Sequence, residues 1–419
     1  MTTLFQKFRD YQISLMLITL LITLESFYSY YLSLNIVYFF VLVVLILQAL
    51  SKIDKIKKKD FTLPNNFLIF FLIIFLLSII SYIYYKPSFE YKFFFKIAYA
   101  LIFIYCLAIS IKNENLKNIL SIVLLIHSGL LIIQFFIFYC FFVQIDFFNL
   151  VWGLEQKGAH LPYRFDRTDI SSYLDLKRFS GLFNEPGTYC NVIGILSCLL
   201  SNIKDLNKFH KIIFCISSLS LLLTFSVYGY LFFIIVLISY TYNYYPKLNF
   251  KNLKNNRSNN FIILLIIFFI LYFLLHYTFP YFKSRFFDYS YQSGLYLRFF
   301  SLIEYFDFLS KDWFLLVFGK GMINETYAFH ETKITYDTSL FLYLLARSGA
   351  FIFLICFIFS LYLLKFNKPK LCTFSIIMLS KLSLFSPIVL FGLYMIIHNF
   401  NDNVCDFRFF IFNCLCSAS

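Results

Sequence analysis

The chain has 419 residues, of which 60% are hydrophobic and 14% charged, whereas a typical soluble domain has roughly 25% charged residues. One water-soluble core cannot bury so much apolar surface, so the composition excludes a soluble globular protein and predicts an all-α polytopic membrane protein forming a single integral membrane domain over 1–419. The formal net charge of +14 does not indicate a nucleic-acid partner, because most lysines lie in short clusters between apolar runs.

The apolar runs predict about 12 transmembrane helices, at roughly 20 residues per crossing. Lys381, near the start of the eleventh predicted span, is expected to extend its side chain to the membrane interface. The predicted spans are 11–29, 33–50, 66–84, 94–111, 118–143, 187–203, two within 212–245, 260–279, 338–364, 374–399 and a weak 407–417.

The basic clusters predict the orientation of these spans. If the N-terminus is cytoplasmic, every short lysine cluster falls on the cytoplasmic side, as the positive-inside rule requires. The break between Thr224 and Gly229 then becomes the tip of a helical hairpin on the outer face. The two long polar segments, about 145–185 and 280–337, become large outer loops.

The arginines are distributed differently from the lysines. Only Arg9 and Arg257 fall on the predicted cytoplasmic side. Arginine binds phosphate or carboxylate through two parallel hydrogen bonds, which indicates anion binding at the outer face. The alternative is that these arginines only anchor the protein at the membrane interface. The arginines on or near the outer face are Arg164, Arg167, Arg178, Arg285, Arg298, Arg347 and Arg408.

The stretch from Arg178 to Cys190 stands out, because it combines a cation, a carboxylate, two glycines and a proline within an apolar setting. Pro186 fits the first turn of a helix, where its missing N–H group would have no partner anyway. Arg178 and Glu185 are therefore expected where a loop meets the mouth of a membrane helix, which indicates a site. The alternative is a capped helix start with an arginine at the interface.

The outer loops carry further candidates. Trp152, Tyr163 and Arg164 combine aromatic rings and charge in a way that suits glycan binding, although a plain solvated loop is the simpler interpretation. His330 is a candidate base on a sugar hydroxyl, and Asp337 suits either catalysis or an N-cap. No ligand spacing indicates a metal, and no phosphate loop or dinucleotide-binding motif indicates a cofactor.

Four places in the chain together resemble the bacterial O-antigen polymerases (Wzy type) of the O-antigen polymerase/ligase superfamily, over about 118–400. The first two are R-x-x-G-x-F-x-E-P at 178–186 and L-T-x-S-x-x-G at 223–229, where Val227 replaces the arginine of many members. The others are Arg298 upstream of G-x-G at 319–321, and D-T-S at 337–339 followed by Gly349.

The resemblance implies a metal-independent membrane glycosyltransferase that needs no cofactor. Its donor and acceptor would be undecaprenyl-pyrophosphate-linked oligosaccharides in the bacterial inner membrane, with membrane lipid and a chain-length-regulating copolymerase as further partners. Arg178 and Arg298, supported by Arg347 and Arg285, would hold the pyrophosphate. The base would be Glu185, His330 or Asp337, and the outer loops would be periplasmic.

Two alternatives remain open. An O-antigen ligase, which transfers the finished glycan to a lipid A core, would bind the pyrophosphate of the donor in the same way. Ligases usually carry a His-Asn pair where this chain has Asp337 and Thr338-Ser339, which favours the polymerase. A flippase or transporter of lipid-linked glycan typically carries its charges within the spans and has inverted repeats, neither of which this sequence displays.

Overall fold

A computed structural model describes part of the chain, and within that part all regular structure is helical. Four of its helices are long and apolar enough to cross a membrane, which confirms the prediction of a helical membrane protein. They are Phe67–Tyr85, Leu116–Phe141, Val227–Tyr244 and Leu340–Phe366. The described residues are 62–86, 89–110, 113–152, 178–203, 206–244, 303, 312–323 and 339–398.

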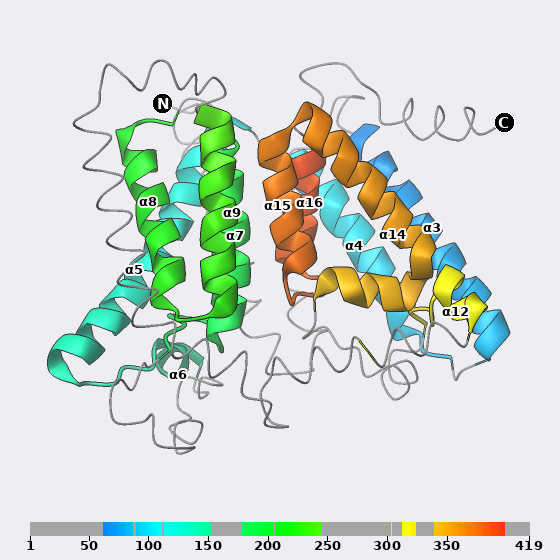
Figure 1. Cartoon of the computed structure of the whole chain (residues 1–419), viewed down its shortest axis with the longest axis horizontal. Helices are drawn as coiled ribbons and strands as arrows, with labels where there is room; N and C mark the ends of the chain where they lie inside the picture. The colour runs from blue at the N-terminus through cyan, green and yellow to red at the C-terminus, as the bar shows by residue number, and fades with distance from the viewer. Residues whose placement is uncertain are drawn as a thin grey trace, which may run out of the picture.

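The helices follow the order of the apolar runs (Figure 1). Most predicted spans within the described ranges coincide with one helix each. Their bounds are α3 Thr62–Tyr85, α4 Lys92–Ser110, α5 Asn113–Phe141, α6 Phe147–Trp152, α7 Pro186–Ser201, α8 Lys208–Leu223, α9 Val227–Tyr244, α12 Trp313–Phe318, α14 Leu340–Phe366, α15 Lys368–Leu379 and α16 Pro387–His398.

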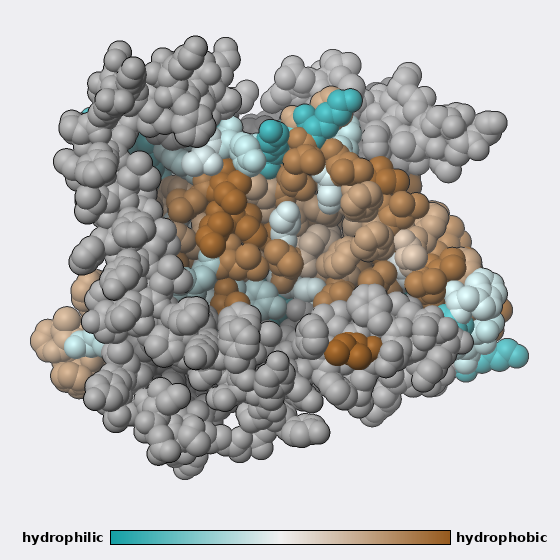
Figure 2. Space-filling model, in the orientation of Figure 1, coloured by the Kyte–Doolittle hydropathy of each residue, from teal (hydrophilic) through white to brown (hydrophobic). Residues whose placement is uncertain are grey.

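The outer surfaces of α3 and α14 are apolar. Figure 2 shows hydrophobic residues across the middle of the visible face, with hydrophilic residues above them. Such a surface would be unfavourable in water, but it matches the hydrocarbon of a bilayer. Exposed large apolar residues on these two helices include Leu72, Leu76, Ile83, Phe351, Leu354, Phe357 and Leu361.

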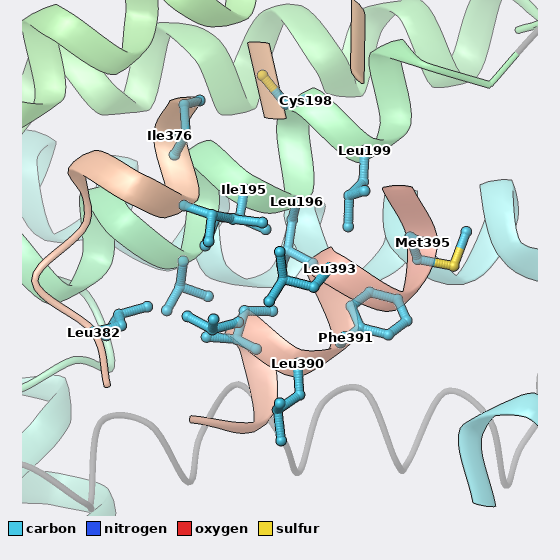
Figure 3. Packing of buried hydrophobic residues seen from close by; sticks show 14 of the residues in the cluster. Ile195, Leu196, Cys198, Leu199, Ile376, Leu382, Leu390, Phe391, Leu393 and Met395 are labelled. Atoms are coloured by element: carbon cyan, nitrogen blue, oxygen red, sulfur yellow. The ribbon is translucent and has the colours of Figure 1, made fainter. Parts of the chain in front are cut away.

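The interior is packed around α7, whose residues are all buried. Figure 3 shows Ile195, Leu196 and Leu199 of α7 facing side chains of α15 and α16. Glycines allow close approach: a Cβ at Gly194 would lie 3.1 Å from the Phe232 ring. Small residues at helix contacts are typical of membrane proteins, where dispersion between closely packed helices replaces the hydrophobic effect.

The predicted break after α8 is confirmed as a tight hairpin. α8 ends at Leu223 and α9 begins at Val227, so only three residues connect them. The Thr224 hydroxyl donates to the carbonyl of Leu221 at 2.7 Å, and it also lies 3.2 Å from the Cys190 thiol of α7. The turn is therefore fixed both to its own helix and to the start of α7.

The predicted span 374–399 is wrong, because this region forms two helices rather than one. α15 ends at Leu379, where Ser380 takes an extended conformation, and α16 begins at Pro387. Pro387 has no backbone N–H to donate to the preceding turn, so it cannot extend a helix that comes before it. It also disfavours helical geometry at the preceding Ser386. The serines between the helices offer competing side-chain hydrogen bonds.

The two helices fold back on each other. Lys370 near the start of α15 donates its ammonium to the carbonyl of Ile396 near the end of α16 at 2.8 Å, and Figure 1 shows the helices side by side. Each has 12 residues, or about 18 Å, against roughly 30 Å of hydrocarbon. The hairpin therefore begins and ends at the same end of the helix bundle.

The helix α14 also departs from a straight span. It bends at Gly349, where φ is 66°, a conformation that favours glycine. A Cβ at this position would lie 2.3 Å from the carbonyl oxygen of Val317 in α12. The bend therefore exists because α12 packs directly against the backbone of α14.

We expect Gly229→Ala to destabilise the protein. Its Cβ would lie 2.2 Å from the carbonyl oxygen of Leu221 and 2.6 Å from the hydroxyl of Thr224, and such overpacking costs about 1–3 kcal/mol. Gly129→Ala is the matched control, because nothing lies within 4 Å of its Cβ position. Thermal unfolding of the purified protein in detergent should give a lower Tm only for the first variant; equal values would contradict the packing.

We expect Lys370→Met to loosen the hairpin of α15 and α16. The change removes the buried ammonium that binds the Ile396 carbonyl, and a hydrogen bond to a charged group contributes about 1.5–3 kcal/mol. Lys368→Met, at an exposed position of the same helix, is the control. A Tm that falls equally in both variants would show that the hairpin does not depend on this bond.

Candidate functional site

The connection between α15 and α16, residues 380–386, is the point where several helices meet; we call it the hairpin tip. The backbone N–H of Leu340, at the start of α14, donates to the Ser380 carbonyl at 2.7 Å. Phe385 stacks on Phe71 of α3, with ring centroids 6.1 Å apart. The Lys381 ammonium lies 5.4 Å from the Tyr228 ring centroid of α9. The tip thus joins helices that are distant in the sequence.

The loop before α7 is held by Gln134 of α5. The side-chain oxygen of Gln134 accepts from the N–H of Gly181 at 3.0 Å, and its amide nitrogen donates to the carbonyl of Ile145 at 2.6 Å. Ser180 bridges the loop by donating to the Phe183 carbonyl at 2.8 Å. Gly181 has φ 59°, so the turn suits glycine. The first resemblance motif is therefore a fixed loop.

Glu185 lies immediately before the first turn of α7, as predicted from the sequence. It is the N-cap residue, and its carboxylate accepts from the Thr188 hydroxyl at 3.3 Å. A Cβ at Gly187 would lie 3.4 Å from the Glu185 Oε1 and 4.0 Å from the Lys381 Nζ. The carboxylate and the ammonium of the hairpin tip therefore face the same small space beside Gly187.

Arg178 joins the same region. Its side chain is half-buried, and its Nε is buried without a hydrogen-bond partner among the described residues. Arg178 and Glu185 both lie close enough to the Cys190 thiol to act on it electrostatically. Cys190 also contacts Thr224, so the second resemblance motif packs against the helix that follows the first. Arg178 and Glu185 thus both lie near the start of α7, and their action as a pair remains a prediction.

Lys381 lies at the hairpin tip, between two helices and not near the start of one span, with the buried Leu382 and Leu384 on its C-terminal side. The hydropathy pattern did not predict this break. The signal was present in the sequence. Three serines and a proline interrupt the apolar run within 380–387, which is the pattern of a break rather than of a continuous span.

Arg347 belongs to a second cluster, at the bend of α14. Its side chain is 2% exposed, and its guanidinium donates to the Gly321 carbonyl at 3.3 Å. The N–H of Gly321 donates to the Arg347 carbonyl at 2.8 Å. The N–H of Lys320 donates to the Ala346 carbonyl at 3.0 Å. The G-x-G turn therefore docks on the bend, and the third and fourth resemblance regions meet at Gly319 and Gly349, since a Cβ at Gly319 would lie 2.6 Å from the backbone nitrogen of Gly349.

The remaining predicted site residues lie outside this geometry. Trp152 is the last residue of α6, a short helix within the first predicted outer loop. Six others lie outside the described residues, and they remain predictions: Tyr163, Arg164, Arg285, Arg298, His330 and Asp337.

Within the described ranges, no group of three or more His, Cys, Asp or Glu side chains could hold a metal ion. Comparison of the chain with known protein families, with curated proteins and with solved structures finds no match.

We expect Gln134→Met to disturb the candidate site through the loop at 178–185. The change leaves the buried Gly181 N–H without its acceptor, which costs about 1–3 kcal/mol. Gln144→Met, at an exposed position, is the control. Thermal unfolding in detergent should distinguish the two, and an unchanged Tm for Gln134→Met would show that the loop is held by other contacts.

Proposed function

We propose that the protein is a polysaccharide polymerase of the bacterial inner membrane. It joins undecaprenyl-pyrophosphate-linked oligosaccharide repeat units at the periplasmic face, and it uses outer-face arginines in place of a metal. The observation that carries this proposal is spatial. The second resemblance motif, at 223–229, lies against the helix that the first motif, at 178–186, begins: Thr224 lies 3.2 Å from the thiol of Cys190, four residues after Pro186.

The arrangement suits the proposed chemistry. A sugar hydroxyl of the acceptor attacks the anomeric carbon of the donor, the bond to pyrophosphate breaks, and lipid pyrophosphate leaves. Arg178 would stabilise the charge on the departing pyrophosphate together with Arg298. Glu185 would take the proton of the attacking hydroxyl, with His330 and Asp337 as the other candidates. Glu185 suits this role because its carboxylate lies where a loop meets the start of α7, and the Lys381 ammonium faces the same space beside Gly187.

A carrier of lipid-linked glycan is the second candidate. One observation favours it: α15 and α16 form a discontinuous pair of short helices with a polar tip. Discontinuous helices, whose N-termini face an anionic ligand, are common at the binding sites of transporters. A polymerase and a carrier would both bind the lipid pyrophosphate. They differ in that only the polymerase forms a glycosidic bond.

The glycan profile of cells carrying Arg178→Ala or Arg298→Ala separates these functions. We expect the surface glycan to collapse to core plus one repeat unit in each variant, while the protein level stays constant, because pyrophosphate departure loses its stabilising charge. Arg9→Ala, on the predicted cytoplasmic side, is the control. A gel that resolves single repeat units is the measurement.

Other profiles would change the assignment. If no repeat unit reaches the core, ligation or transport replaces polymerisation as the function. If both variants give a normal ladder, the two arginines are interface anchors, and the site lies elsewhere.

A further inference from the structure

We propose that residues 312–323 form a re-entrant membrane segment, in which α12 binds the lipid headgroup layer through Trp313. The segment lies within the second predicted outer loop, 280–337. Three features support this inference: the contacts of the segment with α3, the pairing of its backbone and the side chains that it exposes. The inference is independent of the proposed polymerase activity, because it concerns the surface that binds the bilayer.

The segment descends along α3 from the end of that helix. The hydroxyl of Tyr85, the last residue of α3, donates to the carboxylate of Asp312 at 2.7 Å, directly before α12. Further along the segment, the N–H of Met322 donates to the hydroxyl of Ser78 at 3.3 Å. Ser78 lies about two helical turns before Tyr85, or roughly 10 Å along the helix axis, and both residues belong to a candidate membrane span. The segment therefore starts at the end of this span and enters it, between α3 and the bend of α14 (Figure 1).

The turn after α12 pairs its backbone within the protein. The N–H groups of Lys320 and Gly321 donate to carbonyls at the bend of α14, at 3.0 and 2.8 Å. The Gly319 carbonyl accepts from the Ser81 hydroxyl at 3.0 Å, and the Gly319 N–H donates to a carbonyl of α12 at 2.9 Å. With the bond from Met322, every N–H of residues 319–322 is paired. A loop in water needs no such pairing, whereas non-helical backbone at membrane depth requires it.

The two sides of α12 differ in exposure. Phe314 and Leu315 are buried, and the Phe314 ring stacks on that of Tyr84 with centroids 3.8 Å apart. Trp313 and Leu316 lie one turn apart on the other side, and they are 69% and 44% exposed. An exposed tryptophan at the end of a membrane helix is typical of the membrane–water interface, because its ring is apolar and its N–H donates to polar groups.

The neighbouring surface changes character at the same level. Large aliphatic side chains are exposed along α3 as far as Ile83, and the next exposed residue is Tyr84. Lys86, directly after α3, and Lys92, at the start of α4, are also exposed, and hydrophilic residues border the hydrophobic face at this end of α3 (Figure 2). Aliphatic side chains, then aromatic rings, then cations follow the layers of a bilayer from hydrocarbon to headgroups. The surface around Trp313 therefore fits the headgroups of the bilayer whose hydrocarbon covers α3.

Depth-dependent quenching of fluorescence tests the proposal. The chain has two tryptophans, so Trp152→Phe leaves Trp313 as the only one. The full chain with this change is reconstituted in phosphatidylcholine vesicles that carry a nitroxide in the headgroup, at the start of the acyl chain or near its end. We expect each of the first two probes to quench Trp313 at least about twofold more than the third, because the ring lies at the interface.

A position at mid-membrane provides the matched control. Phe357 is 50% exposed and lies in the part of α14 that follows the bend. With both native tryptophans changed to phenylalanine, Phe357→Trp should be quenched most by the probe near the end of the acyl chain. Each variant should keep the Tm of the wild type in detergent, so that a difference in quenching reports depth and not unfolding.

Three results would overturn the proposal. If aqueous iodide quenches Trp313 and the lipid probes do not, α12 lies in water. If neither iodide nor any lipid probe quenches it, protein covers the ring, as in a contact with a second copy. If the probe near the end of the acyl chain quenches it most, α12 lies in hydrocarbon and does not bind headgroups. None of these results bears on the glycan ladder, which tests the proposed function separately.

Discussion

The structure depends on how the backbone of the hairpin tip is satisfied. Hydrocarbon offers no hydrogen-bond partners, so non-helical backbone at a membrane helix must be paired within the protein. The Ser380 carbonyl accepts from Leu340 of α14, and the N–H of Ser386 donates to the Ser383 carbonyl at 3.0 Å. These bonds allow α15 to stop and α16 to start again. They also draw α14 towards the N-termini of α7 and α9, which brings separate parts of the sequence to one place.

The opposite end of the bundle has another kind of chemistry. There Asn202 donates to the Thr373 hydroxyl at 2.9 Å, and Tyr244 donates to the Ile203 carbonyl at 2.6 Å, so the C-termini of α7 and α9 are joined to the start of α15. These groups satisfy one another and cap the carbonyl ends of helices. Lys211 and Lys368 lie over the rings of Tyr244 and Tyr242, so both place positive charge near the negative C-terminal end of α9. One end of the molecule is therefore closed by internal hydrogen bonds, while the other gathers charges of both signs.

The sequence predicted the helices well wherever one apolar run makes one helix. It also placed the turn after Leu223 and the position of Glu185 at the start of α7, because glycine, proline and isolated charges in an apolar chain have few structural uses. The predicted single span at 374–399 is wrong, because the hydropathy of an apolar run indicates its length but not whether the chain turns back within it. That Lys370 reaches Ile396 is a tertiary contact, and no local pattern encodes it.

The resemblance motifs combine two kinds of constraint. Gly229 and Gly349 are positions where any Cβ would meet backbone within 2.3 Å, so packing alone accounts for glycine there. Neither Arg178 nor Glu185 is explained in this way, because the Nε of Arg178 has no partner among the described residues and the Glu185 side chain caps no backbone N–H of its own helix. Residues that packing alone explains indicate how the helices fit together. Charged side chains that packing does not explain indicate what the protein binds. By this criterion Arg178 and Glu185 are the candidate binding residues, whereas the buried Arg347, whose guanidinium donates to the Gly321 carbonyl, has at least part of its role in shaping the bend of α14.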